Sequence, residues 1–341
     1  MTYRFKLQEP VAEGIRRIAL EQIEMAEAKL AAKENTPALI HDARRCLKRL
    51  RALLRLIRPA LDDDAYRHEA EHLSGIGKLL ADARDAHVMR QTLIKLENRP
   101  EPLPKGAATS MHKLLVPAPA PRGRRPGGDG RRQALVRLKQ AKKLFTGKAV
   151  QGAELEHLIE GLESAYDRAR KRFGKAYRKP SDESFHAWRK TVQLHWRHML
   201  LLSRGWPEAL SARASEAKEL SRLLGEDHDY SILLALAESR GAEVLAPDDV
   251  ARLTALCRSC QSELRLEAKP RGARLFAETP DNLTGRIMRY WDSAEHLAAL
   301  APPAGPAQGR AAPVAPHRGQ AAPTARQVLR KTLTSVRRRA R

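Results

Sequence analysis

Hydrophobic and polar positions recur with a helical period along most of this chain, and residues 41–58 show the period most clearly. Wound at about 100° per residue, this segment places its apolar side chains on one face: Cys46, Leu47, Leu50, Leu53, Leu54 and Ile57. The opposite face carries seven basic side chains and one acid, Asp42; the basic residues are Arg44, Arg45, Lys48, Arg49, Arg51, Arg55 and Arg58. The pattern predicts a helix that buries one side and presents a dense row of positive charge on the other.

The same period predicts helices along the rest of the chain. The first covers residues 9–33, and Thr36 and Pro37 then suit the N-cap and first turn of the basic helix. Further helices are expected from the acidic residues 62–64 to residue 80, at 84–97, and from about 132 to 179. The remaining ones are expected at 182–204, 207–224, 227–240, 248–268 and 281–299. Because β-branched residues are not enriched, the chain is predicted to be all-α.

Two segments interrupt this pattern and suggest a domain organisation. Residues 98–132 contain seven prolines and several glycines, which favours a linker or a surface insertion. Residues 301–341 consist largely of Ala, Pro, Gly and Arg, which favours a disordered basic tail. We therefore expect a first helical bundle at 8–97 and a second one at 133–300.

An internal repeat relates the two expected bundles. Residues 41–57, HDARRCLKRLRALLRLI, align with residues 186–202, HAWRKTVQLHWRHMLLL, and both segments begin with a histidine followed by basic residues three and four positions later. Residues 79–89, LLADARDAHVM, align in the same way with residues 223–233, LLGEDHDYSIL. A repeated helical pattern predicts a pseudo-two-fold architecture of two four-helix bundles, with the two basic faces meeting or flanking one cavity.

Charge supports a polyanionic partner only where it is locally patterned. The 341-residue chain has a formal net charge of +23. Nine of these excess positive charges lie in residues 301–341 and six in residues 98–132, which leaves eight for all the rest. Most of the excess therefore belongs to segments without a core pattern, and the argument for a site rests on the basic helices.

These residues resemble a known family. The motifs PVAEGIRRIALEQ (10–22), IHDARRCLKRLRALLRLIRP (40–59), LADARDAHVM (80–89), SDESFHAWRKTVQLHWRHMLLL (181–202) and LLGEDHDYSIL (223–233) are similar to those of CHAD proteins, the conserved histidine α-helical domain family. The resemblance covers residues 8–299 apart from the proline-rich segment. It implies two four-helix bundles that face each other and bind inorganic polyphosphate through basic residues between them.

The resemblance and the helical pattern together nominate binding residues. Matching the family's motifs implicates His41, Arg44, Arg45, Lys48 and Arg49 in the first half, and His186, Arg189 and Lys190 in the second. The helical pattern adds Arg51 and Arg55 on the first basic face and Arg197 on the second. Arg16, Arg17 and Lys171 lie on neighbouring helices, and Lys78 and Arg222 occupy matching repeat positions. Gln193 stands where the family often has a basic residue, so the second basic face is thinner.

Phosphate is the anion that this chemistry favours. Guanidinium groups bind phosphate oxygens in pairs, and cations spaced three and four residues apart along two helices suit a chain of phosphates. His41 and His186 begin the two basic faces and are interpreted as phosphate donors, stronger when protonated because a bound anion raises a histidine pKa. The alternative is that each histidine only hydrogen-bonds its own helix start.

We expect a binding protein that is not an enzyme, because the sequence contains no phosphate-binding loop, nucleophile elbow or paired-carboxylate motif. No cofactor or metal is expected. The first alternative is nucleic-acid binding through the basic tail and linker, and the second is a polyphosphate-processing enzyme. Three cysteines, no apolar leader and no long apolar run favour a cytoplasmic protein without a membrane span. The resemblance also leaves open an association with storage granules.

Overall fold

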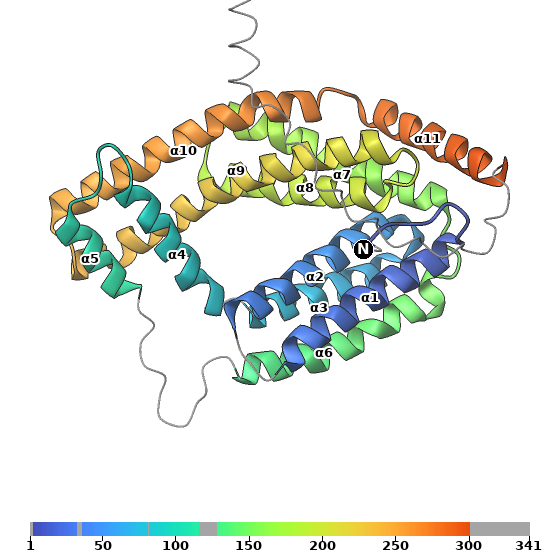
Figure 1. Cartoon of the computed structure of the whole chain (residues 1–341), viewed down its shortest axis with the longest axis horizontal. Coiled ribbons are helices and arrows are strands. Elements are labelled where there is room, and N and C mark those ends of the chain that lie inside the picture. Colours follow the sequence, from blue (N-terminus) through green and yellow to red (C-terminus); the bar gives the residue numbers. More distant parts are fainter. Residues whose placement is uncertain (1–2, 33–35, 81, 116–127, 301–341) are drawn as a thin grey trace, which may run out of the picture. The chain divides into compact units, whose positions relative to one another are not determined.

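The computed structural model describes residues 3–32, 36–80, 82–115 and 128–300, with the side chains of 82–87 and 128–129 left undescribed. The described part is all-α, as predicted, and contains eleven α-helices, three short 3₁₀ helices and no strand. The helices are α1 Val11–Ala31, α2 Pro37–Leu56, α3 Asp63–Leu79, α4 Asp82–Glu97, α5 Lys105–Leu114, α6 Gly128–Thr146, α7 Leu155–Arg178, α8 Asp182–Leu201, α9 Pro207–Arg240, α10 Pro247–Leu275 and α11 Pro280–Leu300 (Figure 1). The expected tail, residues 301–341, lies outside the described residues.

Local sequence signals set several helix starts. Thr36 caps α2, where its hydroxyl accepts a hydrogen bond from the Leu39 amide, and Pro37 occupies the first turn as predicted. Ser181 caps α8 through a reciprocal pair of hydrogen bonds with Ser184. Asp62 caps α3 by accepting from the Ala65 amide. These caps satisfy backbone amides that have no partner within the helix.

The helices α1, α2, α3 and α6 lie side by side, and α7, α8, α9 and α10 form a second group with α11 against α7 (Figure 1). Sequence order suggested that α4 would complete the first group, but α6 packs there against α1 and α3, and α4 packs on α9. Contact between α2 and both α7 and α8 joins the two groups. A pseudo-two-fold relation between them stays a prediction.

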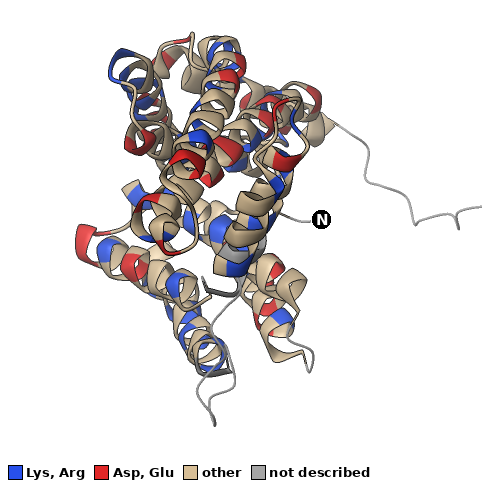
Figure 2. Cartoon of the chain, turned by 90° about the vertical axis from the view of Figure 1, so that its left-hand side faces the viewer, with Lys and Arg blue, Asp and Glu red and all other residues tan. Residues whose placement is uncertain are grey.

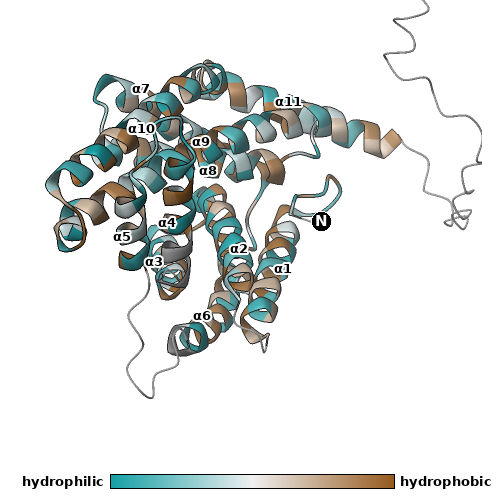
Figure 3. Ribbon diagram, turned by 60° about the vertical axis from the view of Figure 1, so that its left-hand side comes forward, coloured by the Kyte–Doolittle hydropathy of each residue, from teal (hydrophilic) through white to brown (hydrophobic). Residues whose placement is uncertain are grey.

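Two hydrophobic cores hold the described residues together. The larger is built from both helix groups, and every residue predicted on the apolar face of 41–58 is buried in it. The smaller joins α4 and α5 to the distal parts of α9 and α10 and includes Met111, Cys257 and Cys260. Apolar and polar positions alternate along the helices (Figure 3), as expected of helices that bury part of their surface.

The helical pattern expected from about 132 to 179 is divided between α6 and α7, with the 3₁₀ helix Lys148–Val150 between them. Two other segments also differ from the expected secondary structure. Residues 105–114, within the expected linker, form α5 and bury Ala107, Ala108 and Met111. The helices expected at 207–224 and 227–240 are one continuous helix, α9. In both cases tertiary packing stabilises a helix that the local pattern underestimates. Among the helices of the described part, none has the length and apolar character needed to span a bilayer.

Candidate functional site

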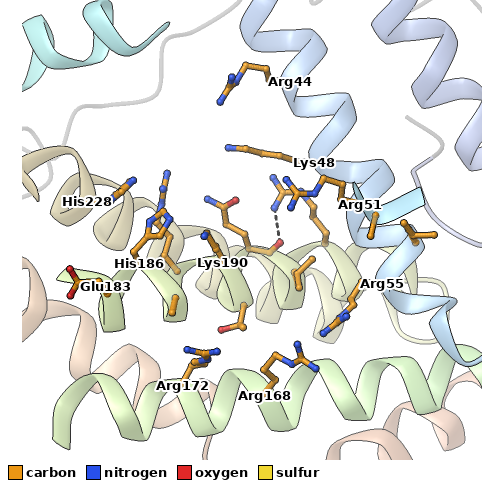
Figure 4. A pocket seen from close by; sticks show the side chains of 18 of the residues that line it. Arg44, Lys48, Arg51, Arg55, Arg168, Arg172, Glu183, His186, Lys190 and His228 are labelled. Atoms are coloured by element: carbon orange, nitrogen blue, oxygen red, sulfur yellow. Dashed lines mark hydrogen bonds between the residues drawn. The ribbon is translucent and has the colours of Figure 1, made fainter. Parts of the chain in front are cut away.

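A cavity of about 910 Å³ lies where α2, α7, α8 and α9 meet, with α4 at one side. Nine Lys and Arg residues line it, together with two acids, Glu183 and Asp229. Figure 4 shows side chains from α2, α7, α8 and α9 around the common space. The nine cavity cations are Arg44, Lys48, Arg51, Arg55, Arg168, Arg172, Arg189, Lys190 and Arg197.

The α2 wall carries four of these cations on successive turns. Because α2 buries its opposite face in the larger core, Arg44, Lys48, Arg51 and Arg55 are directed to the cavity side. The Arg44 guanidinium donates to the Gly77 and Leu80 carbonyls at the end of α3, at 3.1 and 2.8 Å, which fixes its position. These contacts satisfy carbonyls that the helix end leaves open.

The α7 wall adds Arg168 and Arg172, one turn apart. The close approach of α7 to α2 depends on Gly161, because a Cβ there would collide with the Leu56 carbonyl oxygen. Burial and the nearby Arg55 lower the pKa of Arg168. A lowered pKa of an arginine reports a site in which added positive charge is unfavourable, so an anion is favoured there.

The α8 wall carries Arg189, Lys190 and Arg197. Arg197 is only 5% exposed, donates to the Gln193 carbonyl at 2.6 Å, and lies over the Trp196 ring at 4.3 Å. Burial lowers its pKa to about 10, despite the opposing effect of Tyr3. None of the ion pairs among the described residues includes Arg197.

A buried hydrogen bond fixes α8 on α2. The His198 Nε2 atom donates to the Ala52 carbonyl at 2.9 Å, so Nε2 carries a proton. Burial lowers the His198 pKa to about 4. The bond holds the second basic helix against the first, and their cations therefore face a shared space.

Two histidines lie at one side of the cavity. The rings of His186 on α8 and His228 on α9 have centroids 3.9 Å apart with an interplanar angle of 32°. Burial, followed by Lys190 and Arg189, lowers the pKa of His186 to about 4. Burial also lowers the pKa of His228, to about 3. Both rings are thus neutral near pH 7 in the ligand-free protein.

Comparison with protein families agrees with this geometry. The family model of the CHAD domain matches residues 15–238. The chain belongs to the CHAD family. A search of curated proteins found no match. The matched range includes all nine cavity cations and both histidines of the pair, and the family is associated with polyphosphate binding in general.

Half of the residues predicted to bind polyphosphate line the CHAD cavity, and half do not. Those in the cavity are Arg44, Lys48, Arg51, Arg55, His186, Arg189, Lys190 and Arg197. Those absent from its lining are His41, Arg45, Arg49, Arg16, Arg17, Lys171, Lys78 and Arg222. His41 and Lys78 are exposed residues at other places on α2 and α3.

Most of the predicted lysines and arginines that do not line the cavity form ion pairs. Arg45 pairs with Asp42 at 3.1 Å, and Lys171 pairs with Asp167 at 2.6 Å on its own helix. Arg222 contacts two glutamates of α9, three residues before and four residues after it. An acid one turn away gives each of these cations a local partner.

The remaining predicted arginines outside the cavity lining also have partners. Arg17 pairs with Glu9 at 2.7 Å, and Arg16 contacts Glu13 at 3.6 Å. Arg49 lies over the Tyr3 ring at 5.0 Å and also donates to the Gln22 side chain. Positions of Lys and Arg are interspersed with positions of Asp and Glu along the helices (Figure 2).

The sequence left open which basic residues of 166–179 face the cavity, and the structure places Arg168 and Arg172 in its lining. His228, Tyr66 and Asp229 also line it, and none of them was among the predicted binding residues. A signal for the two arginines was present, because neither has an acid three or four residues away, whereas the chosen neighbour, Lys171, has Asp167. No local signal identified His228, since its place beside His186 depends on how α9 packs on α8.

A second cavity, of about 720 Å³, lies between α3 and α6 and is lined in part by His68, Glu69 and His72. Residues 68–72 have the H-E-x-x-H spacing of zinc-binding helices. However, His72 Nε2 contacts the Arg137 carbonyl at 2.8 Å. Within the described ranges, no three His, Cys, Asp or Glu residues are arranged to hold a metal ion.

Proposed function

We propose that this CHAD protein binds inorganic polyphosphate in the nine-cation cavity and does not change it chemically. The observation that carries the proposal is the charge balance of the cavity: nine lysines and arginines from three helices, with Glu183 and Asp229 as its described acids. Like charges held this close repel each other, and a bound anion relieves the repulsion.

The residue types favour phosphate over other anions. Seven of the nine cavity cations are arginines, whose planar guanidinium groups bind two phosphate oxygens at once. The cations come from α2, α7 and α8, so several consecutive phosphates find partners on more than one side (Figure 4). Each neutralised phosphate releases counterions, so the affinity is expected to fall steeply with added salt.

Matched variants on single helices test where the polymer binds. Lys171 and Arg172 are neighbours on α7, but Arg172 lines the cavity, and Lys171 is 77% exposed and paired with Asp167. Arg172→Gln should lower polyphosphate affinity roughly threefold to tenfold and reduce the salt slope by about one. Lys171→Gln should change neither quantity.

A second matched pair tests α2. Lys48 lines the cavity, while Arg45 pairs with Asp42 outside its lining. Titration calorimetry with polyphosphate should give weaker binding for Lys48→Gln and unchanged binding for Arg45→Gln. Equal losses within each matched pair would contradict the cavity as the binding site.

Two further measurements distinguish the alternatives. A chain ending at residue 300 should retain polyphosphate binding, because the described residues belong to one compact unit and include every residue that lines the cavity. Loss of binding in that chain, or equal affinity for nucleic acid of matched charge at physiological salt, would favour nucleic-acid binding through the tail. Shortening of labelled polyphosphate with Mg²⁺ or Mn²⁺ would refute the non-catalytic proposal.

A further inference from the structure

His186 and His228 form a stacked pair within the cationic cavity, and their chemistry differs from that of the surrounding arginines. Their ring centroids lie 3.9 Å apart, and both rings line the cavity. Figure 4 shows them side by side, reaching the cavity from α8 and α9. A histidine changes its charge near physiological pH, whereas an arginine does not.

The pair has an unused hydrogen-bonding atom. His228 Nδ1 lies 3.2 Å from the Ser231 hydroxyl, so that nitrogen has a partner. His186 Nδ1 is buried and has no hydrogen-bond partner among the described residues. A buried polar atom without a partner is unfavourable, so the hydrogen bonding of the pair is incomplete in the free protein. A phosphate oxygen in the cavity can accept a hydrogen bond from a protonated ring of the pair.

The charges around the pair oppose its protonation in the free protein. After burial, Arg189 and Lys190 of α8 lower the pKa of both rings, and His186 also lowers the pKa of His228. Asp182, at the start of α8, has a smaller opposite effect on His228. The other described charged groups lining the cavity near these helices are Glu183 on α8, Asp229 on α9, and Arg44 and Lys48 on α2; α4 contributes Val88 and Met89.

We propose that His186 and His228 act as one protonatable phosphate-binding unit, so that the cavity takes up a proton from solvent when it binds polyphosphate. This inference rests on the proposed function. Phosphate oxygens supply the negative charge that the free cavity lacks and favour the charged form of a nearby imidazole. At this separation a second proton would place two like charges in contact, so the uptake approaches one proton per pair.

The direction of the pH dependence follows from linkage. The complex holds more protons than the free protein, so binding strengthens as the pH falls. With one coupled proton, affinity rises up to about tenfold per pH unit while the bound pair is protonated and the free pair is not. Burial and the neighbouring cations hold the pKa values of His186 and His228 in the free protein at about 4 and about 3, so the effect belongs to mildly acidic and neutral pH.

Calorimetry measures this proton directly. The full-length protein is titrated with tripolyphosphate at pH 6 in buffers that differ in ionisation enthalpy, at constant ionic strength. The expected result is a binding enthalpy that depends on the buffer, with a slope that approaches one proton taken up. His186→Asn with His228→Asn should remove most of that slope while the arginines still bind, and His296→Asn, an exposed position on α11, should leave it unchanged.

The variants also remove the contribution of the ligand's own titration, which is the same for every protein. His228→Asn alone, checked by circular dichroism and urea denaturation, replaces the double variant if that variant does not fold. Strong binding with a buffer-independent enthalpy would overturn proton coupling and leave the proposed function intact. An unchanged slope in the histidine variants would also overturn it, and absence of wild-type binding would overturn both proposals.

Discussion

Arg197 lies in the cavity at a cost to stability, which makes it a direct test of whether the cavity is built for an anion. Its side chain is buried, lines the cavity, and has a pKa lowered from 12.5 to about 10. That difference corresponds to roughly 3 kcal/mol of unfavourable free energy for the charged form, at about 1.4 kcal/mol per pKa unit. Because the pKa stays well above 7, the cost applies throughout the neutral range.

Replacing Arg197 by methionine removes this cost together with two favourable contacts. The guanidinium lies 4.3 Å from the Trp196 ring centroid, a cation–π contact of about 1 kcal/mol. It also donates to the Gln193 carbonyl, a hydrogen bond of about 1 kcal/mol. The difference predicts that the ligand-free Arg197→Met variant is more stable than the wild type by about 1 kcal/mol, although it loses a cavity cation.

The assay is urea denaturation with and without tripolyphosphate, combined with calorimetric titration. Tripolyphosphate should stabilise the wild type more than Arg197→Met, and the variant should bind it roughly tenfold more weakly. Lys171→Met provides the control, because Lys171 is exposed and paired, and should change stability by less than about 0.5 kcal/mol. A clear destabilisation of ligand-free Arg197→Met, or an unchanged affinity, would refute this reasoning.

Three further predictions concern the framework of the cavity. Gly161→Ala should destabilise the protein by about 2 kcal/mol or more in urea denaturation and weaken polyphosphate binding, because its Cβ would collide with the Leu56 carbonyl. His198 has a pKa of about 4 in the folded protein, below its unfolded value of 6.5. The free energy of unfolding should therefore fall by about 3 kcal/mol as the pH is lowered from 6.5 toward 4. His198→Gln should remove this contribution to the pH dependence of the free energy of unfolding. Asp227→Asn should destabilise the protein by about 3 kcal/mol, because buried Asp227 accepts a hydrogen bond from Arg265 at 2.6 Å. Equal urea midpoints for the variant and the wild type would contradict this prediction.

Sequence periodicity predicted the individual helices better than their grouping. The apolar face of α2 and its cap at Thr36 depend on residues a few positions apart, and both are confirmed. The packing of α6 on α1 and α3 depends on contacts across a proline-rich segment without a helical pattern, and periodicity carries no information about it. The place of His228 beside His186 has the same origin, since it is set by the packing of two helices.

For the cavity cations, the sequence contained more information than the net charge suggested. Each of the nine lacks an Asp or Glu three or four positions away, so no acid on its own helix is placed to pair with it. Of the seven predicted lysines and arginines outside the cavity lining, six have such an acid, and the exception is Arg49. Arg49 is instead held by Tyr3 and Gln22, which are distant in sequence.

All nine cavity cations lack an acid three or four positions away, but this absence alone does not place a cation in the cavity. Lys175 on α7 also lacks such an acid, and it does not line the cavity. A helix without intrahelical pairing leaves its positive charge uncompensated, and tertiary packing then determines whether that charge faces bulk water or a shared cavity. Packing α2 against α7 and α8 brings nine such charges together. Their mutual repulsion is the physical basis for the proposal that this cavity binds a ligand with many closely spaced negative charges.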